Sequence, residues 1–215
     1  MYERYSGLAF TMPSDRAVAI LGLQERLAQA FETKAAYGFF EVYFARGLLW
    51  RRGQTQALPR IKQPDGLHVP SWSWFSRDGA IRYMDLKFKR IDWMTREFKN
   101  VFSNQKGPRT ARGSSLRFPE RASVLYGIAK RMDVTKEEMM ADTIFDDNTD
   151  YEVENIRCVT IGYDKTKYVL EDPRYHVLVI AKCQGSAEGE CYERIGVASL
   201  RPAQVAAKGS WVRIE

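Results

Sequence analysis

The chain has 215 residues, 45% hydrophobic and 13% aromatic, a length and composition that predict one folded domain with a sizeable core and exclude a disordered chain. Its net charge of +6 is unevenly distributed, because residues 82–131 carry 13 Lys or Arg against 4 Asp or Glu, whereas residues 132–193 carry 6 against 15. Two such segments can face each other and leave a modest external field, so the charge alone does not indicate a nucleic-acid partner.

The beginning of the chain contains Glu3 and Arg4 in place of the apolar run of a signal peptide, and no stretch is long enough to span a bilayer. Cys158, Cys183 and Cys191 are an odd number of widely spaced cysteines in strand-like runs, which is typical of buried free thiols in a reducing compartment. The histidines and cysteines lack the spacing of zinc ligands. We therefore expect a cytoplasmic protein without a metal or another cofactor.

The first 52 residues predict a helical hairpin. Pro13, Ser14 and Asp15 are typical of a helix start. Apolar side chains then recur at spacings of three and four up to about residue 34, and this helical face consists of Ile20, Leu23, Leu27 and Phe31. A second helix is predicted for residues 35–52, where Gly38 and Gly47 weaken an otherwise helical spacing.

After a predicted loop at residues 53–66, the pattern changes to that of strands. Ser71-Trp72-Ser73-Trp74 alternates small polar and large aromatic residues, which predicts a strand with both tryptophans on one face. Further strands are predicted at residues 81–86, 122–130, 156–163, 175–183, 192–200 and 211–214. The polar, basic residues 103–115 predict a mobile loop. We expect one α+β domain, with the N-terminal helical hairpin (1–52) packed on an antiparallel β-barrel or β-sandwich (67–215).

Several short motifs resemble the stretch that follows the HET domain in fungal heterokaryon-incompatibility (HET) proteins. The most specific is Pro70-Ser71-Trp72-Ser73-Trp74, because a doubled tryptophan in that frame is rare by chance. Weaker pieces occur in the same order along nearly the whole chain, among them Thr11-Met12-Pro13-Ser14-Asp15-Arg16, Leu48-Leu49-Trp50, Cys158-Val159-Thr160-Ile161-Gly162 and Tyr192-Glu193-Arg194-Ile195-Gly196-Val197. The resemblance implies a carboxyl-terminal region of such a protein that lacks the HET domain, so none of that domain's site residues is carried over.

No nucleophile, base and orienting group occur in a recognisable catalytic pattern. His176 lies in a predicted strand, where it is either a structural histidine or a general acid or hydrogen-bond donor. Arg194 interrupts another strand-like run, and it requires either a structural ion pair or a place in a pocket. Together with Tyr126, these two residues are the candidates for catalysis.

Aromatic side chains are the remaining signal. They either fill a large core or, where the gap between hairpin and sheet is incompletely filled, line an apolar pocket with a few hydroxyl or indole donors. Trp72 and Trp74 are expected mostly in the core, and one or more of Tyr126, Tyr163 and Tyr175 in a pocket. The candidates for substrate binding are Trp72, Trp74, Tyr83, Tyr163 and Tyr175.

Two functions are compatible with these features. One is a cofactor-independent fungal biosynthetic enzyme, a cyclase or isomerase such as a Diels-Alderase, which holds an apolar polyene or terpenoid-like molecule in a reactive shape. The alternative is a non-enzymatic interaction or regulatory module derived from the HET family, in self/non-self or stress signalling. No nucleic-acid-binding motif supports a nucleic-acid partner, and the sequence leaves open whether the protein is a monomer or a homodimer.

Overall fold

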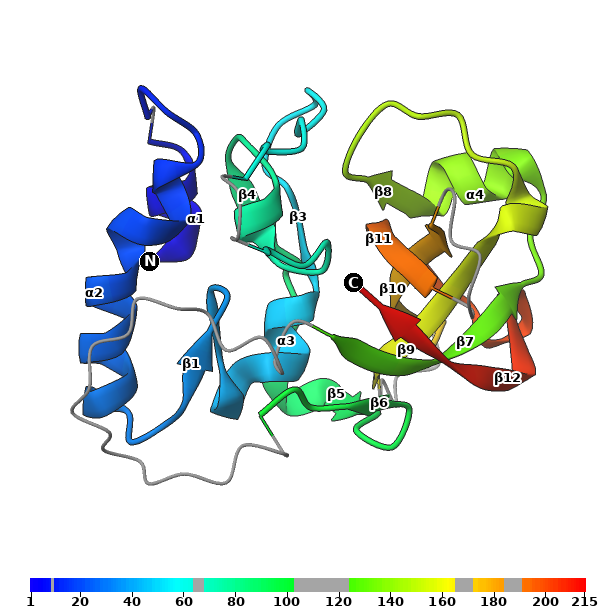
Figure 1. Cartoon of the computed structure of the whole chain (residues 1–215). Helices are drawn as coiled ribbons and strands as arrows, with labels where there is room; N and C mark the ends of the chain where they lie inside the picture. Colours follow the sequence, from blue (N-terminus) through cyan, green and yellow to red (C-terminus); the bar gives the residue numbers. More distant parts are fainter. Residues whose placement is uncertain (9, 64–67, 103–123, 165–171, 184–190) are drawn as a thin grey trace.

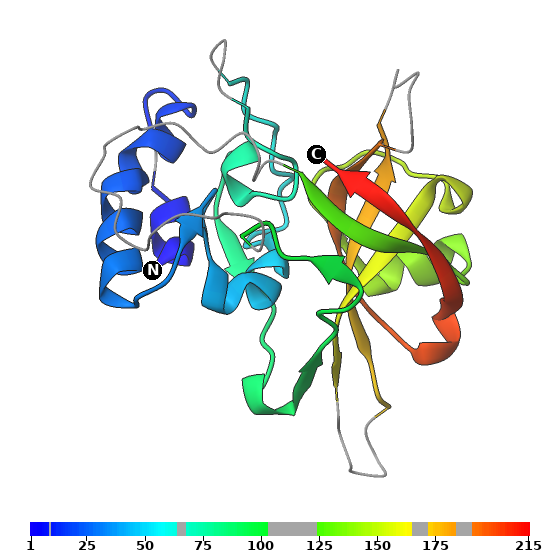
Figure 2. The same ribbon diagram turned by 60° about the horizontal axis from the view of Figure 1, so that its bottom comes forward.

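The computed structural model describes residues 1–8, 10–63, 68–102, 124–164, 172–183 and 191–215. The basic loop predicted at residues 103–115 lies outside these ranges. The chain forms an α+β structure, in which an N-terminal part of mostly short elements (residues 1–102) lies beside a curled sheet, as Figures 1 and 2 show. The long strands of this sheet come from residues 124–215, and residues 91–99 add two short strands to it. No helix among the described residues is long and apolar enough to cross a membrane.

The N-terminal part contains helices, short strands and 3₁₀ turns in rapid succession. In chain order they are α1 (Tyr2–Ser6), α2 (Asp15–Ala30), β1 (Ala35–Ala36), β2 (Phe39–Phe40), η1 (Glu41–Tyr43), α3 (Phe44–Leu48), β3 (Trp50–Arg52), η2 (Trp74–Ser76), β4 (Ile81–Tyr83), η3 (Phe88–Arg90), β5 (Ile91–Trp93) and β6 (Phe98–Lys99). The first predicted helix is confirmed as α2, although its buried face differs from the expected one, because Ile20 is buried while Leu23 and Phe31 are exposed.

The predicted second helix at residues 35–52 is wrong. Tyr37 and Gly38 have positive φ angles of 51° and 80°, which no helix accommodates and which a tight two-residue hairpin loop requires. The chain therefore turns back, and β1 pairs with β2 in place of a helix. Of the expected second helix, only η1 and the short α3 are helical.

The predicted strand around the two tryptophans is also wrong, although both indoles are fully buried as expected. Serine side chains bind backbone groups in place of a strand partner. The Ser73 hydroxyl accepts from the nearby Phe75 amide at 3.1 Å and donates to the Tyr37 carbonyl of the β1–β2 turn at 2.7 Å. Ser76 likewise donates to the Ser73 carbonyl at 2.7 Å. Such local bonds favour a turn over a ladder, and η2 is the result.

The sheet part contains the long strands that the sequence predicts. They are β7 (Leu125–Met132), β9 (Ile156–Asp164), β10 (Tyr175–Lys182), β11 (Cys191–Leu200) and β12 (Val205–Ile214), with β8 (Thr143–Phe145), α4 (Lys136–Asp142), η5 (Val153–Asn155) and η6 (Pro202–Gln204) between them. The order in the eight-stranded sheet is β5-β9-β10-β11-β12-β7-β6, with β8 on β11. All pairs are antiparallel except β11 with β12. β7 also meets β9 over two residue pairs, so the sheet curls but is not the closed barrel that was one expectation.

Both faces of strand β10 are buried. Leu178 and Ile180 of β10 belong to the core shared with the N-terminal aromatic residues, whereas Val177 and Val179 belong to a second core with Met139 of α4. This alternation is typical of a β-strand, in which successive side chains point to opposite faces. The N-terminal part thus packs on one face of the sheet, and α4 contributes to the core on the other.

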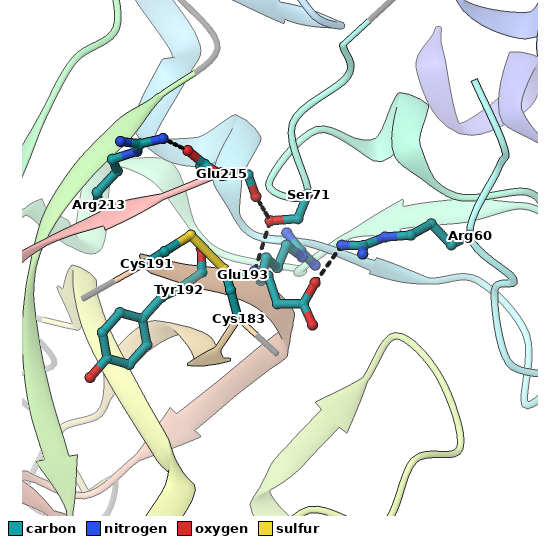
Figure 3. The surroundings of a disulfide bond; sticks show 9 residues. Arg60, Ser71, Cys183, Cys191, Tyr192, Glu193, Arg213 and Glu215 are labelled. Carbon is teal, nitrogen blue, oxygen red and sulfur yellow. Dashed lines mark hydrogen bonds and ion pairs between the residues drawn. A yellow bond between two sulfur atoms is a disulfide. The ribbon is translucent and has the colours of Figure 1, made fainter. Parts of the chain in front are cut away.

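Two of the three cysteines form a disulfide, which corrects the expectation that all three are free. Cys183 follows β10 and Cys191 begins the antiparallel neighbour β11, so their Cα atoms lie 5.6 Å apart and the Cys183 amide donates to the Cys191 carbonyl at 3.0 Å. Figure 3 shows this bond close to the ion pair of Arg60 with Glu193. Only Cys158 is a buried free thiol. The expected reducing compartment therefore loses its supporting observation.

Candidate functional site

The β1–β2 turn, which replaces the predicted second helix, also forms part of the wall of a pocket. The Gly38 amide donates to the Gln24 side-chain oxygen of α2 at 2.9 Å, and the Gly38 carbonyl accepts from the Trp74 indole at 3.3 Å. A Cβ atom at Gly38 would lie 2.4 Å from that indole nitrogen, so only glycine lets the hairpin approach the tryptophan this closely. The β1–β2 hairpin is thereby held between α2 and the aromatic core.

An apolar pocket of about 370 Å³ opens between the hairpin, α1, α2 and α3. Figure 1 shows α1, α2 and β1 on the side of the N-terminal part away from the sheet strands β9 to β12, and α3 between them and the sheet. Its lining is mainly aromatic and aliphatic, with three phenols and one guanidinium, and consists of Met1, Tyr2, Leu27, Phe31, Gly38, Phe39, Phe40, Tyr43, Arg46, Gly47 and Tyr83. Among these residues, Tyr2, Phe39 and Phe40 are buried by the fold itself, so the pocket is part of the folded structure.

The phenols of Tyr2 and Tyr83 form a polar site in this apolar lining. Burial raises the pKa of Tyr83, and the carboxylate of Glu3 raises it further, while the guanidinium groups of Arg46 and Arg194 partly oppose the shift. Burial also raises the pKa of Tyr2. Both phenols therefore remain protonated at neutral pH and can donate a hydrogen bond.

The two phenols differ in what they already bind. The Tyr2 hydroxyl donates to the Gln24 side-chain oxygen at 3.5 Å. Within the described ranges, the Tyr83 hydroxyl makes no such bond; only the Tyr83 backbone amide is fixed, by Glu3 at 2.8 Å. Tyr83 is thus a protonated donor without a protein acceptor, placed beside an apolar pocket.

Trp72 and Trp74, predicted to bind substrate or fill the core, fill the core. Both side chains are fully buried. Trp72 packs edge-on against Phe39 and Phe44, with ring centroids 5.3 Å and 6.0 Å apart, and neither tryptophan is among the residues that line the apolar pocket.

Arg194, a catalytic candidate, forms the buried ion pair that was its alternative interpretation. Its guanidinium donates to both carboxylate oxygens of Asp146, at 2.9 Å and 3.2 Å, and to the backbone carbonyls of Leu48 and Trp50. It lies over the Trp50 ring with 3.3 Å to the centroid. Arg194 and Asp146 are both fully buried, so this sheet residue holds the N-terminal part at α3 and β3.

His176 of β10 is buried, and burial lowers the pKa of its imidazole. Nδ1 lies 3.0 Å from the Ser199 hydroxyl of β11, while Nε2 has no partner within the described part of the chain. Tyr163 of β9 and Tyr175 of β10 are paired in the ladder next to His176, and their ring centroids lie 5.0 Å apart. None of these three residues lines the apolar pocket.

Tyr126, the third catalytic candidate, lies on β7 and is 44% exposed. The ammonium of Lys99 lies 5.7 Å from its ring centroid, a cation–π contact. Tyr83 is therefore the one residue among the eight candidates that lines the apolar pocket.

Sequence reasoning missed Tyr2 and Arg46, which lie beside Tyr83. Tyr2 precedes the first predicted element, and Arg46 lay within a predicted helix that does not form. No group of three His, Cys, Asp or Glu side chains that could hold a metal ion occurs in the described ranges. No family model, curated protein or solved structure gives a significant match to the chain.

Proposed function

We propose that the chain binds an apolar small molecule in the pocket beside Tyr83 and catalyses its cyclisation or isomerisation without a cofactor. The observation that carries this proposal is a 370 Å³ apolar pocket lined by a protonated phenol that has no hydrogen-bond acceptor among the described residues. This volume is in the range of about 300–1,000 Å³ typical of small-molecule sites. A hydrogen-bond donor in an otherwise apolar lining suits a substrate with one polar group.

The chemistry needs no external reactant, because a cyclisation or isomerisation only rearranges the bonds of its substrate. Leu27, Phe31, Phe39 and Phe40 would restrict the conformations of a flexible chain and bring its reacting atoms together. The Tyr83 hydroxyl would donate to an oxygen of the substrate and withdraw electron density from the reacting system. The resemblance to HET proteins supports a fungal origin, and this origin is part of the proposal.

Binding is tested with the neutral fluorescent dye Nile red and a pocket-filling substitution. Leu27→Trp adds volume to the pocket wall, so we expect the dissociation constant to rise by about tenfold or more. Leu23→Trp is the matched control, because Leu23 lies on the same helix, is exposed and does not line the pocket. Equal affinity of both variants and the unchanged protein would overturn the pocket assignment.

Catalysis is tested by deleting the gene and restoring it as the unchanged sequence, Tyr83→Phe or Leu27→Trp. We expect the deletion strain to accumulate a compound of the same mass as a lost metabolite, because the reaction changes no atoms. Both variants should restore less product than the unchanged sequence. Unchanged metabolites in the deletion strain, with intact dye binding, would reject the enzyme.

A second candidate is an interaction module derived from HET proteins in self/non-self or stress signalling. It is favoured by apolar side chains that are more than half exposed at and beside the mouth of the pocket, namely Phe31 (53%), Val42 (57%) and Tyr43 (51%). Deletion should then alter colony fusion between genetically different strains while metabolites stay the same. Normal fusion would reject this function.

A further inference from the structure

We infer that the ligand is an anionic amphiphile, with an apolar chain in the pocket and a carboxylate or phosphate head in an adjoining hollow lined by arginines. This inference rests on the proposed function and specifies its ligand. The hollow has a volume of about 760 Å³ and shares Arg46 and Tyr83 with the apolar pocket. One molecule can therefore contact both regions.

Four arginines line this hollow: Arg4, Arg46, Arg51 and Arg82. None of the four forms an ion pair with any described residue, whereas other arginines of the chain do so readily. Guanidinium groups bind carboxylates and phosphates through paired hydrogen bonds. The hollow thus offers unused donors for an oxyanion.

The placement of two of these arginines is unfavourable for the protein alone. Arg51 of β3 lies directly opposite Arg82 of β4 in the antiparallel pair, and like charges opposite each other destabilise a two-strand pairing. The neighbouring pair in the ladder joins Trp50 and Tyr83, and Tyr83 lines both the hollow and the apolar pocket. An anion bound between the two guanidinium groups would turn this repulsion into attraction.

Acidic residues of the hollow do not neutralise the arginines. Glu3 and Asp85 are the carboxylates in its lining, against four guanidinium groups. One oxygen of Glu3 already accepts the Tyr83 amide. The hollow therefore keeps a positive excess beside the apolar pocket, which is the charge distribution that an amphiphile with a negative head would match.

The test compares three ligands with one chain: dodecanol, dodecanoate and dodecyl phosphate, each below its micelle concentration, titrated by calorimetry. We expect both anions to bind about tenfold or more tightly than dodecanol, and their affinity to fall with added salt. The stronger of the two anions identifies the head as carboxylate or phosphate. Inorganic phosphate alone should bind more weakly than dodecyl phosphate, because it lacks the chain.

Variants assign the effect to the hollow. Arg51→Gln and Arg82→Gln should each abolish the advantage of the anions, leave dodecanol binding unchanged and raise the Tm of the ligand-free protein, since a repulsion is removed. Arg26→Gln on α2, which lines neither region, is the control and should change none of these values.

Three negative results are distinguishable. If dodecanol binds as tightly as the anions and the arginine variants change nothing, the anionic head is rejected while the apolar pocket stands. If neither the alcohol nor the anions bind, the proposed function fails together with this inference. Phosphate binding as tight as that of dodecyl phosphate would reject the amphiphile, because the chain would then contribute nothing.

Discussion

The sheet part and the N-terminal part satisfy their backbones in different ways. Strands β7, β9, β10, β11 and β12 are 8 to 10 residues long and bind one another through continuous ladders. Strands β1 to β4 have only two or three residues, so serine, glutamine, tryptophan and arginine side chains bind the backbone groups between them. Short elements joined by side chains leave a pocket beside a packed core, whereas the long ladders form two continuous apolar faces.

The two parts are joined at a fully buried ion pair. Arg194 belongs to β11, yet its guanidinium donates to backbone carbonyls of α3 and β3. It also binds the carboxylate of Asp146, which directly follows β8. A buried guanidinium is tolerated only when its donors are bonded. The N-terminal part is therefore held to the sheet by a fully buried and satisfied ionic group, by the more exposed ion pairs of Arg60 with Glu193 and Arg77 with Asp147, and by apolar packing.

The largest expected effect comes from breaking this connection on one side. Arg194→Met leaves the Asp146 carboxylate fully buried without its partner, which should lower the free energy of unfolding by about 3–5 kcal/mol. Urea unfolding followed by tryptophan fluorescence measures this loss. The double variant Arg194→Met with Asp146→Leu should recover most of it, because no buried charge remains; a double variant as unstable as the single one would contradict this account.

The aromatic core of the N-terminal part gives an effect of similar size by another mechanism. Trp74→Ala removes a fully buried indole and should cost about 3–5 kcal/mol in the free energy of unfolding, as removal of large core side chains does. Nile red binding to the folded fraction should persist, because Trp74 does not line the pocket. A cost below about 1 kcal/mol combined with lost binding would make Trp74 a site residue.

A smaller effect is expected in the sheet, where ladders already fix the strands. Replacing Cys183 and Cys191 together by serine removes a disulfide that spans eight positions, and the freed loop should lower the free energy of unfolding by about 2–3 kcal/mol. Unfolding of the two proteins without reductant measures the difference. Cys158→Ser is a poor control because Cys158 is buried, so the unchanged protein with reductant serves instead and should match the double variant.

The sequence predicted the sheet better than the N-terminal part for a physical reason. A strand such as β10 alternates Val177 and Leu178 between two cores, and a period of two is readable along one segment. In residues 35–52, aromatic spacing favoured a helix, but the left-handed conformations of Tyr37 and Gly38 ended it. Gly38 is visible in the sequence, but within a helical spacing a glycine indicates only a weak point of the helix.

The candidate site was predictable only in part for the same reason. Tyr83 is one of the aromatic residues predicted to bind substrate, and it lines the pocket. Arg46 and Tyr2 come from other elements, and they join Tyr83 only because the β1–β2 hairpin replaces the expected helix. Arg194 was recognised as a charge that needs a partner, but the partner Asp146 lies 48 positions away, a distance over which single-sequence patterns carry no information.

The smallest effect concerns pH and the sheet's buried histidine. Burial lowers the pKa of His176 in the folded protein, with Asp164 opposing the shift and Arg174 adding to it, while the unfolded pKa is about 6.5. Because the unfolded chain binds the proton more readily, the stabilisation is present above pH 6.5 and is lost as pH falls below it. The loss is at most about 1.4 kcal/mol per pH unit.

His176→Asn isolates this contribution, because its amide can replace the Nδ1 contact with Ser199 but does not titrate. Urea unfolding at pH 7.5, 6.5 and 5.5 should show the unchanged protein losing more stability than the variant, and only below pH 6.5, since the carboxylates of the two proteins are the same. Parallel pH profiles would mean that His176 takes up its proton equally well in the folded sheet. The sheet would then tolerate a buried charged imidazole whose Nε2 has no partner among the described residues. Such a result would contradict the requirement, seen at Arg194, that a buried charged group has its donors bonded.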